Sequence, residues 1–305
     1  MKILLVGKNG QVGYELERSL QGIGEIVSVD RTKMDLANLR QVRDIVQQIK
    51  PSLIINSAAY TAVNEAESES ELAMCINGDA PGVMAEEAFK LGATMIHYST
   101  DYVFDGAKRG PQGELVAYTE EDVPNPINIY GKTKLAGEKL IVASGCPYLI
   151  FRTSWIYGTR GENFLLTMLR LAQENDELSV IADQYGAPTW SRTVSAVTSR
   201  ILREAFHSKK TTKWWEGISG IYHLTSQGNT TWFGFAQAIM MKAAQLGLLD
   251  KQAPSIRPIS TKDYSTPVLR PLNSLLNSER LARSFGISCP AWQDSLSKCL
   301  LSAGK

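Results

Sequence analysis

The chain contains few residues from which a disulfide framework or a metal centre could be built. Its 305 residues include only 4 cysteines and 3 histidines. Cys75, Cys146, Cys289 and Cys299 are widely separated and form no C-x-x-C pair, which is the spacing that zinc ribbons and redox dithiols require. We therefore expect reduced, mostly buried thiols and no metal site.

The sequence also lacks an excess of charge of one sign and lacks a long apolar run. Lys and Arg number 32 against 31 Asp and Glu, so no overall field attracts nucleic acid or an anionic membrane. No apolar run approaches the roughly 18 residues of a membrane span, and no signal-peptide pattern precedes the first apolar segment. We expect a cytoplasmic protein that binds neither nucleic acid nor membranes and that meets any anionic ligand locally.

Short apolar runs alternate with helical patterns through the first half of the chain. The pattern predicts strands at 3–6, 25–29, 53–56 and 94–98 and helices at 11–20, 39–49, 71–77 and 81–91. Repeated strand–helix units indicate a parallel sheet with helices on both faces. Ligands of such sheets bind at the carboxyl ends of the strands, so the loops after Val6, Val29, Asn56 and Tyr98 should line the site.

The second half continues this rhythm and then loosens beyond about residue 210. It predicts helices at 132–143 and 164–174, a strand at 148–152, and one more unit of the sheet at 178–181 and 194–206. We expect an α/β fold, a Rossmann-type doubly wound parallel sheet with a smaller, discontinuous C-terminal α/β substrate domain. The dinucleotide-binding domain would comprise 1–152, about 173–211 and 238–262, and the substrate domain about 153–172, 212–237 and 263–305.

A glycine-rich segment at 7–13, GKNGQVG, joins the first strand to the first helix. Gly7 permits a tight turn, Gly10 lets backbone amides approach a pyrophosphate, and Gly13 lets helix and strand pack closely. The G-x-x-G-x-x-G spacing differs from the G-x-G-x-x-G fingerprint, and a glycine triplet can also be only a turn. We predict that this loop binds a dinucleotide through Gly7, Gly10, Gln11, Val12 and Gly13.

The end of the second strand leaves the choice of cofactor open. Asp30 stands about 20 residues beyond the loop, where a carboxylate binds the adenosine ribose of NADH. Arg31 could instead pair with the 2′-phosphate of NADPH, and both residues could simply form a solvated turn. We expect NADPH or NADH, with NADPH slightly favoured. Asp35 and Leu36 are expected to cap the next helix and to border the adenine.

Tyr130 and Lys134 stand at i and i+4 of a predicted helix and share one face. In carbonyl reduction a phenol donates its proton poorly at neutral pH unless a cation stabilises the phenolate, and Lys134 can do so. A Y-x-x-x-K pattern is also common on solvated helix faces. Ser99 and Thr100 follow the fourth strand, where the Thr100 hydroxyl could orient a substrate carbonyl, although a Ser-Thr-Asp turn can also cap its own backbone.

Seven segments together resemble a known family over nearly the full length of the chain. They are GKNGQVG at 7–13, NSAAYTAV at 56–63, HYSTDYVF at 97–104, YGKTKLAGE at 130–138, FRTSWIY at 151–157, DQYGAPT at 183–189 and RPLNS at 270–274. The chain resembles the extended short-chain dehydrogenases/reductases and, within them, the dTDP-4-dehydrorhamnose reductases. That resemblance implies NAD(P)H-dependent reduction of the C4 ketone of dTDP-4-dehydro-6-deoxy-L-mannose to dTDP-L-rhamnose, the last step of dTDP-rhamnose biosynthesis for cell-surface polysaccharide.

The resemblance also implies roles for single residues. The catalytic residues would be Thr100, Tyr130 and Lys134, and Ala58, Ala59 and Tyr60 would join the glycine loop at the cofactor. Ser99, at the end of the fourth strand, is also expected to contact the cofactor. The substrate would contact Val63, Thr100, Tyr102, Trp155, Asn163, Gln184 and Arg270. Trp155 offers an apolar face to a deoxysugar and Arg270 a fork to a diphosphate, while core packing and a surface salt bridge are the alternatives for these two side chains.

Several functions remain open at this stage. The same residues fit another nucleotide-sugar 4-ketoreductase or an epimerase, and a non-catalytic NADP-binding regulatory subunit has a related fold. Net consumption of NAD(P)H separates a reductase from an epimerase, which recycles bound NAD. Pocket shape decides the nucleotide and the stereochemistry at C4, and the chain could be a monomer or a homodimer.

Overall fold

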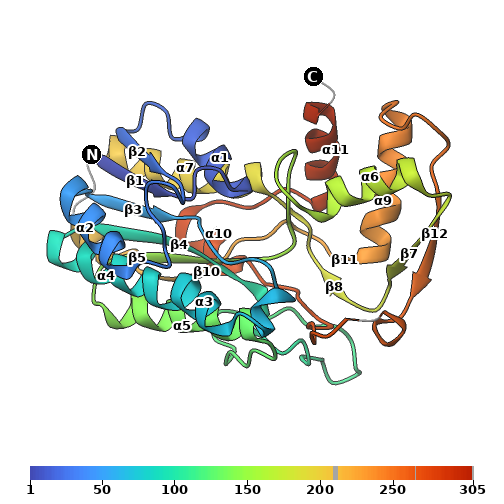
Figure 1. Ribbon diagram of the computed structural model, residues 1–305, viewed down its shortest axis with the longest axis horizontal. Helices are drawn as coiled ribbons and strands as arrows, with labels where there is room; N and C mark the ends of the chain where they lie inside the picture. The colour runs from blue at the N-terminus through green and yellow to red at the C-terminus, as the bar shows by residue number, and fades with distance from the viewer. Residues whose placement is uncertain (209–211, 265, 304–305) are drawn as a thin grey trace.

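The computed structural model describes residues 1–208, 212–264 and 266–303 (Figure 1). Within these ranges six parallel strands form the large sheet, in the order β10-β5-β4-β3-β1-β2. The strands are β1 (Lys2–Val6), β2 (Glu25–Val29), β3 (Leu53–Asn56), β4 (Thr94–Thr100), β5 (Tyr148–Thr153) and β10 (Gly220–His223). Because the central strands are covered on both faces, β1 and β3 are almost continuously apolar.

Helices cover both faces of the large sheet. On one face α1 (Gln11–Ser19) packs against α7 (Ser191–His207), and on the other lie α2 (Leu39–Ile49), α4 (Ala80–Leu91) and α5 (Ile129–Ala143) (Figure 1). Alternate side chains of β1 enter the two cores, with Ile3 and Leu5 toward α1 and Leu4 toward α2. This arrangement confirms the predicted Rossmann-type doubly wound fold.

A short irregular helix precedes α4. The predicted helix at 71–77 is α3 (Ser70–Met74) followed by the π-helical turn η2 (Cys75–Asp79). The π turn directs Asn77 inward, where its Nδ2 donates to the Tyr60 carbonyl at 3.0 Å and to the Thr133 hydroxyl at 3.2 Å. Asn77 thereby ties the loop after β3 to α5, which is a common use of such turns beside functional sites.

The smaller lobe lies beside the carboxyl ends of the large sheet and contains short strand pairs (Figure 1). The pairs are β7 (Glu177–Ile181) with β12 (Ser255–Ile259), β8 (Tyr185–Gly186) with β11 (Thr230–Thr231), and β6 (Ile156–Tyr157) with β9 (Thr189–Trp190). Its helices include α6 (Phe164–Glu174), α9 (Trp232–Gln245) and α11 (Trp292–Ala303). Tyr157, Phe235 and Trp292 form an aromatic centre between them.

Two sheet assignments made from the sequence are wrong. The pattern at 178–181 predicts a strand of the large sheet, yet β7 pairs with β12 in the smaller lobe. The segments 173–211 and 238–262, which were expected to belong to the dinucleotide-binding domain, therefore each contribute a strand to the smaller lobe. The sixth strand of the large sheet is β10, which lies within the range 212–237 expected for the substrate domain. The error at β7 arises because periodicity reveals a strand but not the strand with which it pairs. The strand β10 was missed because it is short and ends at a polar residue, His223.

Other features bear on the remaining expectations. The predicted domain boundary near residue 211 falls outside the described residues, and the two-domain division stays a prediction. The remaining helices are η1 (Glu65–Glu67), η3 (Asp101–Val103), α8 (Thr212–Ile218), η4 (Thr261–Asp263) and α10 (Glu279–Phe285). All four cysteines are free, and three are buried, as expected. Among the described residues no helix is long and apolar enough to span a membrane.

Candidate active site

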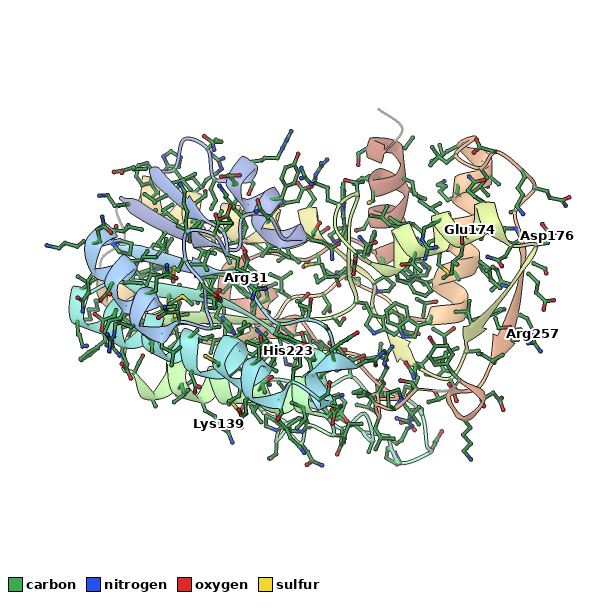
Figure 2. The ribbon with its side chains drawn as sticks, viewed as in Figure 1. Arg31, Lys139, Glu174, Asp176, His223 and Arg257 are labelled. Carbon is green, nitrogen blue, oxygen red and sulfur yellow. The ribbon has the colours of Figure 1, made fainter. Side chains whose placement is uncertain are left out.

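A cavity of about 630 Å³ opens at the carboxyl ends of the large sheet. A second pocket of about 310 Å³ adjoins it beyond Asp30 and Arg31, which line both. The side chains are drawn in Figure 2, where the labelled Arg31 marks this region and Glu174, Asp176 and Arg257 lie at the outer end of the smaller lobe. The two spaces lie where Rossmann-type folds bind a dinucleotide.

Two glycines of the loop are required by packing. Gly7 has a φ of +87°, which side-chain-bearing residues rarely adopt, and a Cβ there would lie 2.8 Å from the Ala58 amide nitrogen. A Cβ at Gly13 would lie 2.1 Å from the Gly7 carbonyl oxygen. Gly10 is different, because the nearest atom to its Cβ position is that same oxygen at 3.4 Å.

Gly10 is also the N-cap of α1, and no side chain caps the first amides of the helix. Such uncapped amides at the positive end of a helix dipole bind phosphate groups. Gln11 and Val12, which begin α1, line the cavity beside them. The shape of the loop therefore fits the pyrophosphate of NAD(P)H, as the sequence predicts.

Asp30 is held in place as a carboxylate by its own loop. Its Oδ1 accepts hydrogen bonds from the Thr32 hydroxyl at 2.6 Å and the Thr32 amide at 3.1 Å, and Lys8 Nζ lies 3.6 Å from Oδ2. The Thr32 hydroxyl is the largest cause that lowers the pKa of Asp30 to about 2. Arg31 beside it is 80% exposed and has a 3.9 Å contact to Asp35, so its guanidinium can reach a ligand.

The expected helix cap at Asp35 is wrong. The N-cap of α2 is Asn38, whose Oδ1 accepts a hydrogen bond from the Gln41 amide at 3.0 Å. Asp35 lies three residues too early and accepts instead from the Ala37 amide. Asp35 and Leu36 do line the second pocket, and their place beside the adenine stays a prediction.

Tyr130 and Lys134 stand on the first turns of α5 and both line the large cavity. The helix begins here because Asn128 caps it, with Oδ1 accepting from the Gly131 amide at 2.8 Å. Burial raises the pKa of Tyr130 to about 12, and the Thr100 hydroxyl opposes that rise. Burial lowers the pKa of Lys134 to about 8, so the lysine can release its proton near physiological pH.

The Lys134 side chain is held by hydrogen bonds to β4, from residues for which the sequence predicts no role. Its Nζ donates to the Tyr98 carbonyl at 2.6 Å and lies 3.1 Å from Nε2 of His97. Nδ1 of His97 in turn faces Nδ2 of Asn56 at 3.2 Å. Burial holds the pKa of His97 well below its ordinary value, so a neutral imidazole supports the lysine. A polar residue inside an apolar strand is the sequence signal for such a group.

Thr100 is the last residue of β4, two residues beyond the predicted end of that strand. It lines the cavity, and its hydroxyl donates to Oδ1 of Asp101 at 3.0 Å. Ser99 also lines the cavity, but its hydroxyl donates to buried Glu138, which pairs with Arg152 at 2.7 Å. Thr100 is therefore better placed than Ser99 to meet a reacting group.

Trp155 forms one wall of the large cavity. Its φ of +48° is strained for a residue with a side chain, and its ring stacks on Trp232 with centroids 3.6 Å apart. A Cβ at Gly186 would lie 2.3 Å from the Trp155 indole. The indole is thus fixed between Gly186 and Trp232, a contact between distant segments that sequence analysis did not find.

The chain is similar to known proteins along its whole length. The family model described as the RmlD substrate binding domain matches residues 1–304. A curated dTDP-4-dehydrorhamnose reductase from Burkholderia thailandensis is 44% identical over 301 residues, covering 98% of each chain. The chain belongs to the dTDP-4-dehydrorhamnose reductase family.

Further relatives of this family agree with that assignment. A curated reductase from Salmonella typhimurium is 41% identical, covering 98% of this chain and 97% of its own. The crystal structure of a dTDP-4-dehydrorhamnose reductase from Bacillus anthracis in complex with NADP is 33% identical, with a TM-score of 0.87 and 99% coverage of both chains. The chain therefore shares its overall fold, including the large sheet and the smaller lobe, with that structure.

The structure gathers most of the residues predicted to bind the cofactor. Those that line the large cavity are Gly7, Gly10, Gln11, Val12, Asp30, Arg31, Ala58, Ala59, Ser99, Tyr130 and Lys134. Tyr60 lines the second pocket with Asp35 and Leu36, and Gly13 packs behind the loop. The residues lie together as a cofactor site requires, and contact with the cofactor itself stays a prediction.

The residues predicted to bind the substrate are less closely gathered. Thr100 and Trp155 line the large cavity, whereas Val63, Tyr102, Asn163, Gln184 and Arg270 lie outside its lining. The Tyr102 ring meets the Tyr130 ring edge-on at 5.5 Å. An Arg270 guanidinium nitrogen donates to Asn64 at 3.2 Å, and its buried Nε has no partner within the described residues.

Asn163 and Gln184 are engaged by the protein. Asn163 caps α6, and its Nδ2 donates to Gln11 at 3.0 Å, so it ties the smaller lobe to the glycine loop. Nε2 of the buried Gln184 donates to the Thr261 hydroxyl at 3.2 Å. Substrate contact by these two residues stays a prediction, and their observed contacts indicate support of the cavity walls.

Proposed function

We propose that this protein reduces the C4 ketone of dTDP-4-dehydro-6-deoxy-L-mannose with NADPH or NADH and so forms dTDP-L-rhamnose. The observation that carries the proposal is the meeting of Tyr130, Lys134 and Thr100 in one cavity with the glycine loop. The family supplies the substrate class, since the curated relatives from Burkholderia thailandensis and Salmonella typhimurium, which match at about full length, carry the name of this reductase.

The residues of the site divide the chemistry between them. Bound NAD(P)H supplies the hydride. Tyr130 donates its proton to the carbonyl oxygen, and the resulting phenolate is stabilised by the Lys134 ammonium across one turn of α5. The Thr100 hydroxyl orients the carbonyl oxygen at the end of β4. The part of the Trp155 indole that lines the cavity offers apolar surface to the 6-deoxy side of the sugar.

The second pocket favours NADPH by a modest margin. Arg31 lines this pocket and is exposed, so its guanidinium stands where a 2′-phosphate would bind. Asp30 opposes that phosphate and suits the ribose hydroxyls of NADH. Use of both cofactors is the expected consequence.

The direct test is an assay with the purified protein, NADPH or NADH, and dTDP-4-keto-6-deoxy-L-sugar made in place by epimerising the D-sugar. We expect the near-ultraviolet absorbance of the cofactor to disappear in step with the formation of dTDP-L-rhamnose. Conversion of the sugar without net cofactor oxidation would identify an epimerase instead. Cofactor binding without turnover of any keto sugar would favour a regulatory subunit.

Two further properties remain part of the proposal. A cytoplasmic location fits a protein whose described residues hold no membrane-spanning helix, and cell fractionation tests it. The chain could act as a monomer or a homodimer, which light scattering across a range of concentrations distinguishes. Neither property changes the chemistry assigned to the cavity.

A further inference from the structure

Asp101 carries a buried carboxyl group and stands beside the proposed catalytic residues. It is only 3% exposed, follows Thr100 directly, and lines the large cavity. Its Oδ1 accepts the Thr100 hydroxyl at 3.0 Å. Its Oδ2 has no partner at hydrogen-bond distance in the part of the chain that the structure describes, although the Ser274 hydroxyl lies near enough to the carboxyl group to oppose the rise of its pKa. A buried carboxylate oxygen without a hydrogen bond is costly.

The Thr100 hydroxyl has only one proton to give. A threonine hydroxyl offers one donor and two acceptor lone pairs. The Tyr102 amide donates to this oxygen at 3.1 Å and uses one lone pair, while the proton points to Asp101. As long as Asp101 is a carboxylate, Thr100 therefore has no proton for a substrate carbonyl.

Protonation of Asp101 reverses the direction of this hydrogen bond. A neutral carboxyl group at 3.0 Å can donate to the remaining lone pair of Thr100, which frees the threonine proton. We propose that Asp101 is a positioning residue that takes up a proton as the cofactor and substrate bind and thereby turns the Thr100 hydroxyl toward the substrate carbonyl. This inference rests on the proposed reductase function and deepens it.

The surroundings of Asp101 favour the neutral carboxyl group. Burial raises the pKa of Asp101 to about 6, and the hydroxyls of Ser274 and Thr100 offset part of the rise. The cofactor and the nucleotide sugar both carry phosphates and exclude water, and each effect disfavours a further negative charge. A carboxyl group that is largely ionised in the free protein is thus expected to be protonated in the ternary complex.

Four other ionisable groups lie around Asp101 or line the same cavity. Tyr102 on η3 and Tyr130 on α5 both have raised pKa values, so they stay neutral near pH 6. Arg270, from the C-terminal segment, is close enough to Tyr102 to oppose the rise of its pKa. Lys134 on α5 titrates near pH 8. Of these groups, only Asp101 is expected to change charge near pH 6.

Proton uptake on binding is the decisive measurement. NADPH and dTDP-L-rhamnose cannot react with each other, so isothermal titration of the NADPH-loaded protein with dTDP-L-rhamnose near neutral pH, in two buffers of different ionisation enthalpy, gives the number of protons taken up. We expect up to about one proton per site for the natural chain. Asp101→Asn should show none while binding dTDP-L-rhamnose within about threefold of the natural affinity. Thr100→Val, which keeps the carboxyl group, should retain the uptake.

The turnover number distinguishes a positioning role of Asp101 from a purely structural role. The amide introduced by Asp101→Asn can donate to Thr100 as a neutral carboxyl group does, so this variant should keep kcat within roughly tenfold, whereas Thr100→Val loses more. On rising pH the kcat/KM of the natural chain should fall through pH 6 and that of Asp101→Asn should stay level there.

The outcomes separate this inference from the proposed function. Binding of dTDP-L-rhamnose by the natural chain without proton uptake would overturn the role of Asp101 and leave the reductase intact. The role of Asp101 would also be overturned if Asp101→Asn had a kcat as low as that of Thr100→Val while its thermal unfolding midpoint equalled that of the natural chain. If the natural chain did not bind dTDP-L-rhamnose at all, both the proposed reductase function and the role of Asp101 would be contradicted.

Discussion

The two ends of the cavity achieve their purpose by different physical means. At the nucleotide end the site is made of backbone, with Gly7 and Gly13 excluding any Cβ and the uncapped start of α1 facing the cavity. At the chemical end it is made of buried side chains, since His97, Lys134 and Asp101 are each 3% exposed or less. The first end should therefore respond to changes of shape, and the second to changes of protonation.

The largest effect is expected from the proton donor at the chemical end. Tyr130→Phe removes the phenolic proton and keeps the ring, so kcat should fall by about a hundred- to ten-thousandfold. Cofactor affinity, followed by fluorescence titration, should stay within about threefold. Tyr148→Phe, at the distant start of β5, is the matched control and should keep full activity. Near-natural turnover by Tyr130→Phe would exclude this residue as the acid.

The glycine loop should respond in a different manner. Gly13→Ala places a Cβ 2.1 Å from the Gly7 carbonyl oxygen, which should cost about 1–3 kcal/mol of unfolding free energy and weaken NADPH binding by about tenfold or more. Gly10→Ala has room within the protein, so it should weaken binding and leave stability nearly unchanged. Thermal unfolding and NADPH titration distinguish the two effects.

A matched control exists for these two variants. Gly217 on α8 has no atom within 4 Å of its Cβ position, so Gly217→Ala should leave NADPH binding unchanged and should not lower stability, because alanine favours the helix over glycine. Equal loss of stability in Gly10→Ala and Gly13→Ala would contradict the distinction between a glycine that packs and a glycine that admits phosphate.

The protonation of Lys134 predicts the alkaline limb of the rate profile. Burial lowers its pKa from 10.5 to about 8, so the ammonium that stabilises the phenolate is present below pH 8 and lost above it. We expect a further fall of kcat/KM by up to about tenfold per pH unit above that point, in addition to the fall through pH 6 expected from Asp101, while the affinity of the glycine loop for NADP⁺ changes little. A rate that stays level through the alkaline range, with the fold intact, would count against an ammonium at this position.

The smallest effect is expected at the exposed edge of the nucleotide end. Arg31→Ala should raise the KM for NADPH by about three- to tenfold and leave the KM for NADH unchanged, because only NADPH carries the 2′-phosphate. Arg40→Ala, an exposed change on α2, is the control. Steady-state kinetics with both cofactors measure the ratio, and an equal change for both would place the guanidinium elsewhere.

Local pattern in the sequence predicted the nucleotide end better than the walls of the cavity. The strand, glycine loop and helix at 2–19 are contiguous, so their packing follows from spacing alone. The Trp155–Trp232 stack and the link from Asn163 to Gln11 join distant segments, and no periodicity reports such pairs. For the same reason the sequence pattern assigned β7 to the wrong sheet.

The chemical end was predicted in part. Tyr130 and Lys134 follow from helical spacing, and Thr100 from the end of an apolar strand. The roles of His97 and Asp101 depend on burial and on which hydrogen-bond donor faces which acceptor, quantities that only the folded chain defines. Both residues lie in the HYSTDYVF segment, so the sequence marked their location without their function.

The most direct test of the central claim, a net reduction at C4, follows the hydride itself. The protein would be given NADPH carrying deuterium at the transferable position together with dTDP-4-keto-6-deoxy-L-sugar, and the product examined by NMR and mass spectrometry. We predict one deuterium at C4 of dTDP-L-rhamnose for each NADPH oxidised. A product without deuterium at C4, or a sugar converted while NADPH stays reduced, would contradict the reductase.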